Sequence, residues 1–176
     1  MECLPNKWPW ELNKMDFTGK RVLVTGGSRG IGRAVSIAFA ERGATVAVLY
    51  QRNEVAAAET LAALNGSGHR AFTCHISQPA DVSKTVQEVS SALGAIDVLI
   101  NNAGIGIYHP LADSTYEQWQ AAWQATLATN LIGPANLCYC VAHKMIEQGG
   151  GRIVNISSRG AFRGEPTKPA YGASKA

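Results

Sequence analysis

Short, nearly continuous apolar runs that alternate with helical periodicity constrain the fold of this chain most strongly. Five such runs predict β-strands at residues 21–25, 45–50, 71–76, 96–101 and 152–157. Helical periodicity occupies the stretches between them, at residues 31–42, 54–64, 81–93 and about 115–148. Strands without polar alternation are typical of sheets that are covered on both faces. The alternation therefore predicts an α/β protein with a Rossmann-like, doubly wound parallel sheet.

Composition and charge exclude several other classes of protein. The chain has 176 residues, of which 46% are hydrophobic and 16% are charged, so it can bury a core and is not disordered. Its formal net charge of +3 comes without a dense basic stripe, so nucleic-acid binding is not indicated. No run of 18 apolar residues occurs, which excludes a membrane-spanning helix.

Cysteine and histidine spacing indicates neither a disulfide framework nor a metal site. The four cysteines form no CxxC pair, and the four histidines lack the spacing of metal ligands. Cys74 and His75 are adjacent, but two ligands without partners do not make a metal site. We therefore expect a reduced, cytoplasmic protein without a bound metal. Residues 1–15 do not resemble a secretory signal and are interpreted as a flexible N-terminal extension or a misassigned start.

A glycine-rich loop joins the first predicted strand to the first predicted helix. It begins at Thr25, and its candidate phosphate-binding residues are Gly26, Ser28, Arg29, Gly30, Ile31 and Gly32. Glycines permit tight turns and a close backbone approach, and a helix N-terminus offers free N–H groups to a phosphate. The alternative interpretation is a tight connection without a ligand. Because the loop joins strand to helix, we expect a dinucleotide-binding site.

Two arginines favour NADP over NAD as that dinucleotide. NAD sites usually carry Asp or Glu about 20 residues past the glycines, where the carboxylate binds the ribose 2′-hydroxyl. The position 20 residues past Gly32 holds Arg52, and Arg29 in the loop adds a second cation. Guanidinium groups suit a 2′-phosphate. The alternative is that both arginines simply face solvent.

A tyrosine and a lysine near the end of the chain have the spacing of an acid–base pair. Tyr171 and Lys175 are four residues apart, so on a helix they lie on the same face. An isolated tyrosine has a pKa of about 10, so proton exchange near neutral pH needs a cation that favours the phenolate. The Ser158 hydroxyl, 13 residues before the tyrosine, could steady a substrate oxygen.

The combination of motifs resembles the short-chain dehydrogenase/reductase family, in its TGxxxGxG and YxxxK branch. The matching features, in order, are Thr25–Gly32, the segment Asn101-Asn102-Ala103-Gly104, Asn130, Ser158 and the pair Tyr171/Lys175. The resemblance implies an NADP-dependent oxidoreductase that interconverts a carbonyl and a secondary alcohol by hydride transfer. Its substrate would be a small carbonyl or alcohol compound. In the members that this sequence resembles most, the 3-oxoacyl-acyl-carrier-protein reductases, the substrate is a 3-oxoacyl thioester.

The same resemblance implies a role for each matching residue. Ser158, Tyr171 and Lys175 correspond to a catalytic triad, and Asn130 to a fourth member that holds a proton-relay water. The cofactor wall would include Asn102, Ala103 and Gly104, and the cofactor would also contact Tyr171 and Lys175.

Two further positions bear on these roles. Pro134 lacks the N–H that would bond the Asn130 carbonyl, so that carbonyl could accept from a relay water, or Pro134 could begin a separate helix after Gly133. His75 stands where the family usually has an Asp that contacts adenine, and it cannot supply a carboxylate.

Members of this family continue well past the lysine, whereas this sequence stops at Ala176. We therefore expect residues 16–176 to form an incomplete NAD(P)-binding domain, truncated after Lys175, with its C-terminal strands missing and the fifth strand uncovered. The 176 residues alone are not expected to turn over substrate, because the tyrosine helix is too short to hold its geometry. The alternative function is a truncated, non-catalytic nucleotide-binding product. The full-length protein would be a homo-oligomer.

Overall fold

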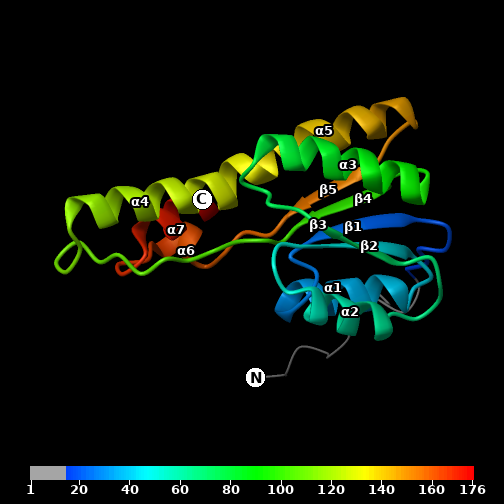
Figure 1. Cartoon of the computed structure of the whole chain (residues 1–176), viewed down its shortest axis with the longest axis horizontal. Coiled ribbons are helices and arrows are strands. Elements are labelled where there is room, and N and C mark those ends of the chain that lie inside the picture. Colours follow the sequence, from blue (N-terminus) through cyan, green and yellow to red (C-terminus); the bar gives the residue numbers. More distant parts are fainter. Residues whose placement is uncertain (1–14) are drawn as a thin grey trace, which may run out of the picture.

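One parallel sheet of five strands organises the molecule. The computed structural model describes residues 15–176 and orders the strands β3-β2-β1-β4-β5 (Figure 1). The strands are β1 (Arg21–Thr25), β2 (Thr45–Tyr50), β3 (Arg70–Thr73), β4 (Val98–Asn101) and β5 (Arg152–Asn155). Every neighbouring pair is parallel, and the order reverses at β1. The predicted Rossmann-like, doubly wound α/β fold is therefore confirmed. The predicted extension, up to residue 14, lies outside the described residues.

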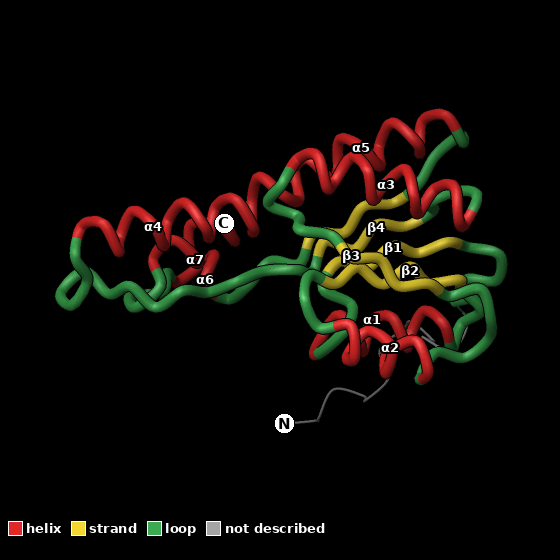
Figure 2. Tube along the Cα trace, in the orientation of Figure 1, coloured by secondary structure: helices red, strands yellow, loops and turns green. Residues whose placement is uncertain are grey.

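Helices cover both faces of this sheet and continue beyond one end of it (Figure 2). The helical elements are α1 (Gly30–Ala40), α2 (Glu54–Ala62), α3 (Pro79–Leu93), α4 (Tyr116–Leu127), the π-helical turn η2 (Ala128–Ile132), α5 (Gly133–Glu147), α6 (Gly160–Arg163) and α7 (Pro169–Lys175). α1 and α2 lie on one face, and α3 and α5 lie on the other (Figure 2). α4, α6 and α7 gather beyond the carboxyl ends of the strands (Figure 1).

Alternate residues of the strands build a separate core on each face of the sheet. Val22 and Val24 of β1 belong to the core beneath α1 and α2. Leu23, between them, belongs to the opposite core, together with Leu137 and Val141 of α5. All five side chains are completely buried. Burial on both faces explains why the strands read as continuous apolar runs.

The ends of the helices follow from local sequence. The Asn53 side chain accepts a hydrogen bond from the Ala56 N–H at 2.9 Å and starts α2. Thr115 and Gln118 form a capping box at the start of α4. Gly94 ends α3 with a φ of +81°, a conformation that glycine adopts without strain. The predicted end of α3 at residue 93 therefore rests on a recognisable cap.

Three predicted helices have different bounds in the structure. α1 spans Gly30–Ala40 instead of 31–42, and α2 ends at Ala62 instead of 64. α3 begins at Pro79 instead of 81, because proline fits the first turn of a helix, where its missing N–H costs nothing.

Three strands are shorter than predicted, because a strand ends where its partner ends. β3 stops at Thr73 instead of 76, since the next N–H, of Cys74, reaches the last residue of β2 and the chain then turns. β4 begins at Val98 instead of 96, and its neighbour β5 stops at Asn155 instead of 157. Apolar periodicity does not encode these limits, which depend on the register of the sheet.

The predicted long helix is present, but it contains a π turn. It runs from Tyr116 to Glu147 as α4, η2 and α5. The Gly133 N–H bonds the carbonyl of Ala128, five residues back, and Pro134 follows without an N–H to give. The irregular turn therefore falls where proline removes a regular helical hydrogen bond.

β5 is an uncovered edge of the sheet, as expected. All four of its residues are exposed, and β4 is its sole partner among residues 15–176. Within the same part of the chain, no helix is both long enough and apolar enough to span a membrane.

Candidate active site

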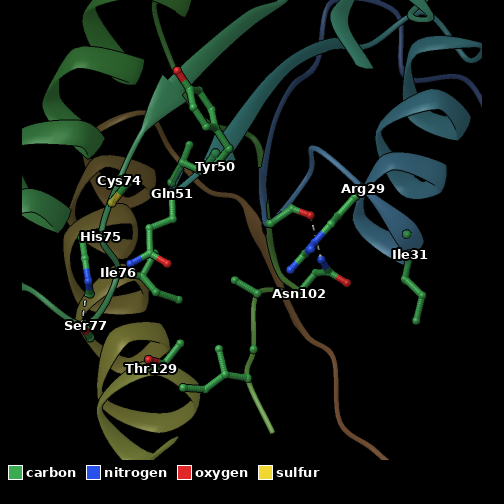
Figure 3. Close-up of a pocket in the computed structure, with 16 residues that line it drawn as sticks. Arg29, Ile31, Tyr50, Gln51, Cys74, His75, Ile76, Ser77, Asn102 and Thr129 are labelled. Atoms are coloured by element: carbon green, nitrogen blue, oxygen red, sulfur yellow. Dashed lines mark hydrogen bonds between the residues drawn. The ribbon is translucent and has the colours of Figure 1, made fainter. Parts of the chain in front are cut away.

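A cavity of about 400 Å³ lies at the carboxyl ends of the strands (Figure 3). It lies where the strand order reverses at β1, which is flanked by β2 and β4. In open α/β sheets this crevice is the usual place for a ligand. Of the predicted cofactor-binding residues, those that line it are Gly26, Arg29, Gly30, Ile31, Asn102, Ala103 and Gly104. The predicted glycine loop and cofactor wall therefore meet around one cavity.

The glycines of the loop allow three segments to approach closely. A Cβ at Gly32 would overlap the Gly26 carbonyl and lie 2.6 Å from Asn102 Nδ2, so a side chain there would separate α1 from the loop. Gly26 has a φ of +63°, and its own Cβ would lie 3.1 Å from the Ala103 Cα. Gly30, with a φ of +54°, faces open space at the start of α1. Space and free helix N–H groups at this point suit a phosphate.

Hydrogen bonds attach the cofactor wall to the end of β1. The Thr25 hydroxyl accepts from the N–H groups of Asn102 and Ala103 at 3.0 and 2.9 Å. The Asn102 side chain returns a hydrogen bond to the Thr25 carbonyl at 2.9 Å. The wall and the loop are therefore held together as one unit.

Other predicted cofactor residues do not line the cavity. Ser28 is buried, and its carbonyl accepts hydrogen bonds from Arg33 and Thr60, which attaches the loop to α1 and α2. Arg52 is exposed and lies outside the cavity lining. Of the two arginines that favour NADP(H), Arg29 alone therefore lines the cavity.

Two lining residues at the ends of β2 and β3, Gln51 and Ser77, were not predicted from the sequence, whereas His75 was considered as the residue that replaces an adenine-contacting Asp. Gln51 follows β2 directly, and His75 and Ser77 follow β3. In the view of Figure 3, Gln51 and His75 lie across the cavity from Arg29. His75 Nδ1 and the Ser77 hydroxyl are 2.8 Å apart, which fixes the imidazole against the wall. Gln51 and Ser77 could have been found by counting residues from the strand ends instead of from the glycines.

Cys74, directly after β3, also lines the cavity, next to His75. It is buried, and burial raises the pKa of its thiol above the ordinary value. A thiol of this kind packs against the wall and is not a reactive thiolate. Across residues 15–176, no group of three His, Cys, Asp or Glu side chains is arranged to hold a metal ion.

Asn130 and Lys175 meet beside the cofactor wall. Asn130 accepts from the Ile105 N–H and donates to the Ile105 carbonyl, both at 2.8 Å. A Cβ on Gly104 would lie 3.3 Å from Asn130 Oδ1 and 3.5 Å from Lys175 Nζ. Lys175 donates to the Ile156 carbonyl at 2.9 Å. Asn130 and Lys175 also line a second cavity, of about 370 Å³, between α5, β5 and α7.

Tyr171 lies in α7, and Ser158 lies just before α6, the helix that packs against α7. A Cβ on Gly106 would lie 3.5 Å from the Tyr171 ring, so the segment after the cofactor wall runs along that ring. The Ser158 hydroxyl accepts from the Gly160 N–H at 3.2 Å, and the neighbouring Ser157 hydroxyl donates to the Lys175 carbonyl at 2.7 Å. Neither Tyr171 nor Ser158 lines either cavity.

The fold is an open parallel α/β sheet with a cavity where the strand order reverses, an arrangement that dinucleotide-binding domains share. The sequence pattern of the short chain dehydrogenase family matches residues 20–176, and the chain belongs to that family. The family binds nicotinamide cofactors, and the relatives that the chain matches are named dehydrogenases and reductases.

Individual relatives agree with the family assignment. The chain is 38% identical to D-threitol dehydrogenase of Mycolicibacterium smegmatis, over 89% of this chain and 59% of that protein. It is also 38% identical to the 3-oxoacyl-[acyl-carrier-protein] reductase FabG of Chlamydia muridarum, over 91% of this chain and 64% of that protein. The crystal structure of NAD⁺-bound xylitol dehydrogenase superposes with a TM-score of 0.81 at 33% identity, over 92% of this chain and 61% of that chain. The chain thus spans about three fifths of the length of these relatives.

Proposed function

We propose that this protein is an NADP(H)-dependent oxidoreductase that interconverts a carbonyl and a secondary alcohol, with Tyr171 as the general acid and base. One observation carries the proposal. Lys175 Nζ and Asn130 Oδ1 converge on Gly104, which also lines the dinucleotide cavity, and Tyr171 lies one helical turn before Lys175. The relatives named above are dehydrogenases or reductases, and none favours a non-catalytic product.

The residues around the cavity fit a dinucleotide. The open space at Gly30, with the free N–H groups of α1 behind it, suits the phosphates. Arg29 supplies a cation on the same side for a 2′-phosphate. Gln51, His75 and Ser77 offer hydrogen-bonding groups for the adenosine part.

The chemistry divides between cofactor and protein. A nicotinamide held beside Asn102, Ala103 and Gly104 would supply the hydride to the carbonyl carbon, or take it back from the alcohol. During reduction the Tyr171 hydroxyl gives its proton to the substrate oxygen, and the Lys175 ammonium favours the phenolate that remains. The Ser158 hydroxyl donates a hydrogen bond to the same substrate oxygen. A water held near Asn130 returns a proton toward Tyr171 from solvent.

The substrate is a small molecule with a carbonyl or secondary hydroxyl group. The similarity to FabG supports a 3-oxoacyl thioester, and the similarity to the two polyol dehydrogenases supports a sugar alcohol. The proposal includes a cytoplasmic location and a homo-oligomeric complete protein.

The test measures hydride transfer in the complete protein, meaning these 176 residues with any that the reading frame adds after Ala176. Oxidation of NADPH and NADH is followed by absorbance with a 3-oxoacyl thioester, simple ketones and ketoses, and the reverse reaction with threitol and xylitol. We expect turnover with one of these classes and faster turnover with NADP(H). No turnover with any of them would contradict the oxidoreductase, and faster turnover with NAD(H) would contradict the cofactor assignment.

A further inference from the structure

α7, which carries Tyr171, is too short to hold its own position. It has seven residues, and its N-cap residue, Lys168, makes no side-chain capping hydrogen bond. Isolated helices of fewer than about 12 residues are marginal in water. The place of the Tyr171 ring must therefore be set by contacts that other elements make with α7.

One such contact comes from His109, in the loop between β4 and α4. The side chain of His109 is 1% exposed, and its Nε2 accepts a hydrogen bond from the Ala170 N–H at 3.3 Å. Ala170 is the second residue of α7, and its N–H is one of the groups that a helix start leaves without an intrahelical partner. His109 therefore supplies the cap that the sequence of α7 lacks.

The other ring nitrogen fixes the tautomer of His109. Nδ1 lies 2.8 Å from the Ile107 carbonyl, which can only accept, so Nδ1 carries the proton. Nε2 is then free to accept from Ala170, as it must to cap α7. The indole of Trp119 meets the imidazole edge-on, with centroids 5.3 Å apart, and holds the ring in this plane.

The same loop is joined to α7 at two further points. The His109 N–H donates to the Thr167 carbonyl at 2.9 Å, just before α7. Asn130, which binds Ile105 in the loop, also donates to the Ser174 hydroxyl at 2.9 Å. The loop is thus joined directly to the start of α7 and, through Asn130 of η2, to its end.

We propose that His109 is a positioning residue for Tyr171: it caps α7 through Nε2 and so couples the loop after the cofactor wall to the tyrosine helix. The inference rests on the proposed function of Tyr171. Tyr171 directly follows the capped residue, so loss of the cap lets the ring move. A displacement of about 1 Å can cost about 100-fold in rate.

Two conservative variants separate the two hydrogen bonds of the ring. In His109→Asn the amide nitrogen takes the place of Nδ1 and keeps the bond to Ile107, but nothing reaches Ala170. In His109→Gln the longer side chain places an acceptor near the position of Nε2 and keeps the bond to Ala170. Comparison of the two variants therefore separates the effect of losing the hydrogen bond to Ala170 from the effect of replacing the buried imidazole by another polar side chain.

Hydrogen exchange of the backbone amides tests the cap without relying on catalysis. In the complete protein we expect the Ala170 and Tyr171 amides to exchange about tenfold faster in His109→Asn, the effect of losing about one hydrogen bond. His109→Gln should stay close to the wild type, and β1 amides such as that of Leu23 should be unchanged in both. The proposal would be overturned if the Ala170 and Tyr171 amides exchanged at the same rate in the two variants. It would also be overturned if the β1 amides were accelerated in His109→Asn as much as those of α7.

Kinetics then test the consequence for Tyr171. We expect kcat to fall at least tenfold in His109→Asn and to recover in His109→Gln, with the dissociation constant for NADPH unchanged in both. An unchanged kcat in His109→Asn would overturn the positioning role. If the wild type itself shows no turnover, the exchange data still decide whether His109 caps α7, and the proposed function alone fails.

Discussion

Arg29 and Arg52 carry the same charge but lie in different surroundings. Arg29 lines the dinucleotide cavity at the start of α1, whereas Arg52 is exposed beyond the end of β2. Gln51, and not Arg52, is the residue of this turn that reaches the cavity. An arginine beside a phosphate makes charge-assisted hydrogen bonds, but an exposed charge acts through solvent and is screened. If the cavity holds the dinucleotide as proposed, Arg29 should therefore influence cofactor choice more than Arg52.

Arg29→Ala should weaken NADPH binding about tenfold and NADH binding much less, because the lost contact is to the 2′-phosphate. Arg52→Asp should move the preference toward NADH by a smaller factor, through long-range repulsion of that phosphate. Dissociation constants from fluorescence titration, at low and high salt, measure both effects. Wild-type protein that binds NADH as tightly as NADPH would refute the assignment.

At the scale of elements, Asp97 joins the starts of three strands. Its carboxylate accepts from the Arg21 N–H at 2.8 Å and from Arg21 Nε at 2.6 Å, across β1 and β4. Its carbonyl accepts from the Arg152 N–H at 2.9 Å, at the start of β5. Burial raises the pKa of Asp97, but the hydrogen bonds and charge of Arg21 outweigh burial and hold that pKa below its ordinary value.

Asp97→Asn should lower the free energy of unfolding by about 1 kcal/mol at pH 7, since it removes a partly screened charged contact. Because the pKa is lower in the folded state, the carboxylate stabilises the fold above its ordinary pKa of about 4, and this contribution is lost as pH falls through the folded-state value. Urea unfolding at several pH values measures the difference. The exposed pair Lys84–Glu88 supplies the control, Glu88→Gln, which should change little. A gap between wild type and Asp97→Asn that grows toward acid would contradict this account.

The sequence predicts the existence and type of the principal elements better than their ends. Buried runs such as Val22–Val24 are apolar because both faces of the sheet are covered, so periodicity identifies them. The end of β3 and the start of β4 depend on partner strands that no local pattern describes. The π turn at 128–132 and the short helix α6 were also missed, since each depends on packing beyond its own residues.

In the candidate site too, local motifs could be predicted from the sequence, whereas residues brought together by the strand order could not. The predicted motifs that follow a strand directly, at Gly26 and at Asn102, line the cavity. Gln51 and His75 come from the ends of two other strands, and the strand order brings them to the cavity. His109 could not be predicted, because its partner Ala170 is 61 residues away.

At the scale of the whole molecule, the sheet has a doubly paired centre and two edge strands, β3 and β5, of which all β5 residues are exposed. β1 is paired on both sides, whereas β5 leaves Ile153 and Val154 at 36% and 43% exposure. Unpaired strand edges offer a row of N–H and C=O groups to another chain. This edge therefore offers a surface along which the 176-residue polypeptide is expected to associate.

We expect the 176-residue polypeptide to form species larger than its monomer mass of 18.7 kDa at micromolar concentration. Val154→Lys places a charge on the edge and should shift the population toward monomer. Val55→Lys, at an exposed position on α2, is the matched control and should behave as the wild type. Light scattering after size exclusion distinguishes these outcomes, and a monodisperse monomeric wild type would rule out association along β5.

Tyr171→Phe tests the central claim most directly. The substitution keeps the ring that packs against Gly106 and removes only the transferable proton. In the complete protein, we expect NADPH binding to be unchanged and kcat to fall about 10²–10⁴-fold, the usual contribution of a general acid. A variant that keeps more than about a tenth of the wild-type kcat would show that another group gives the proton.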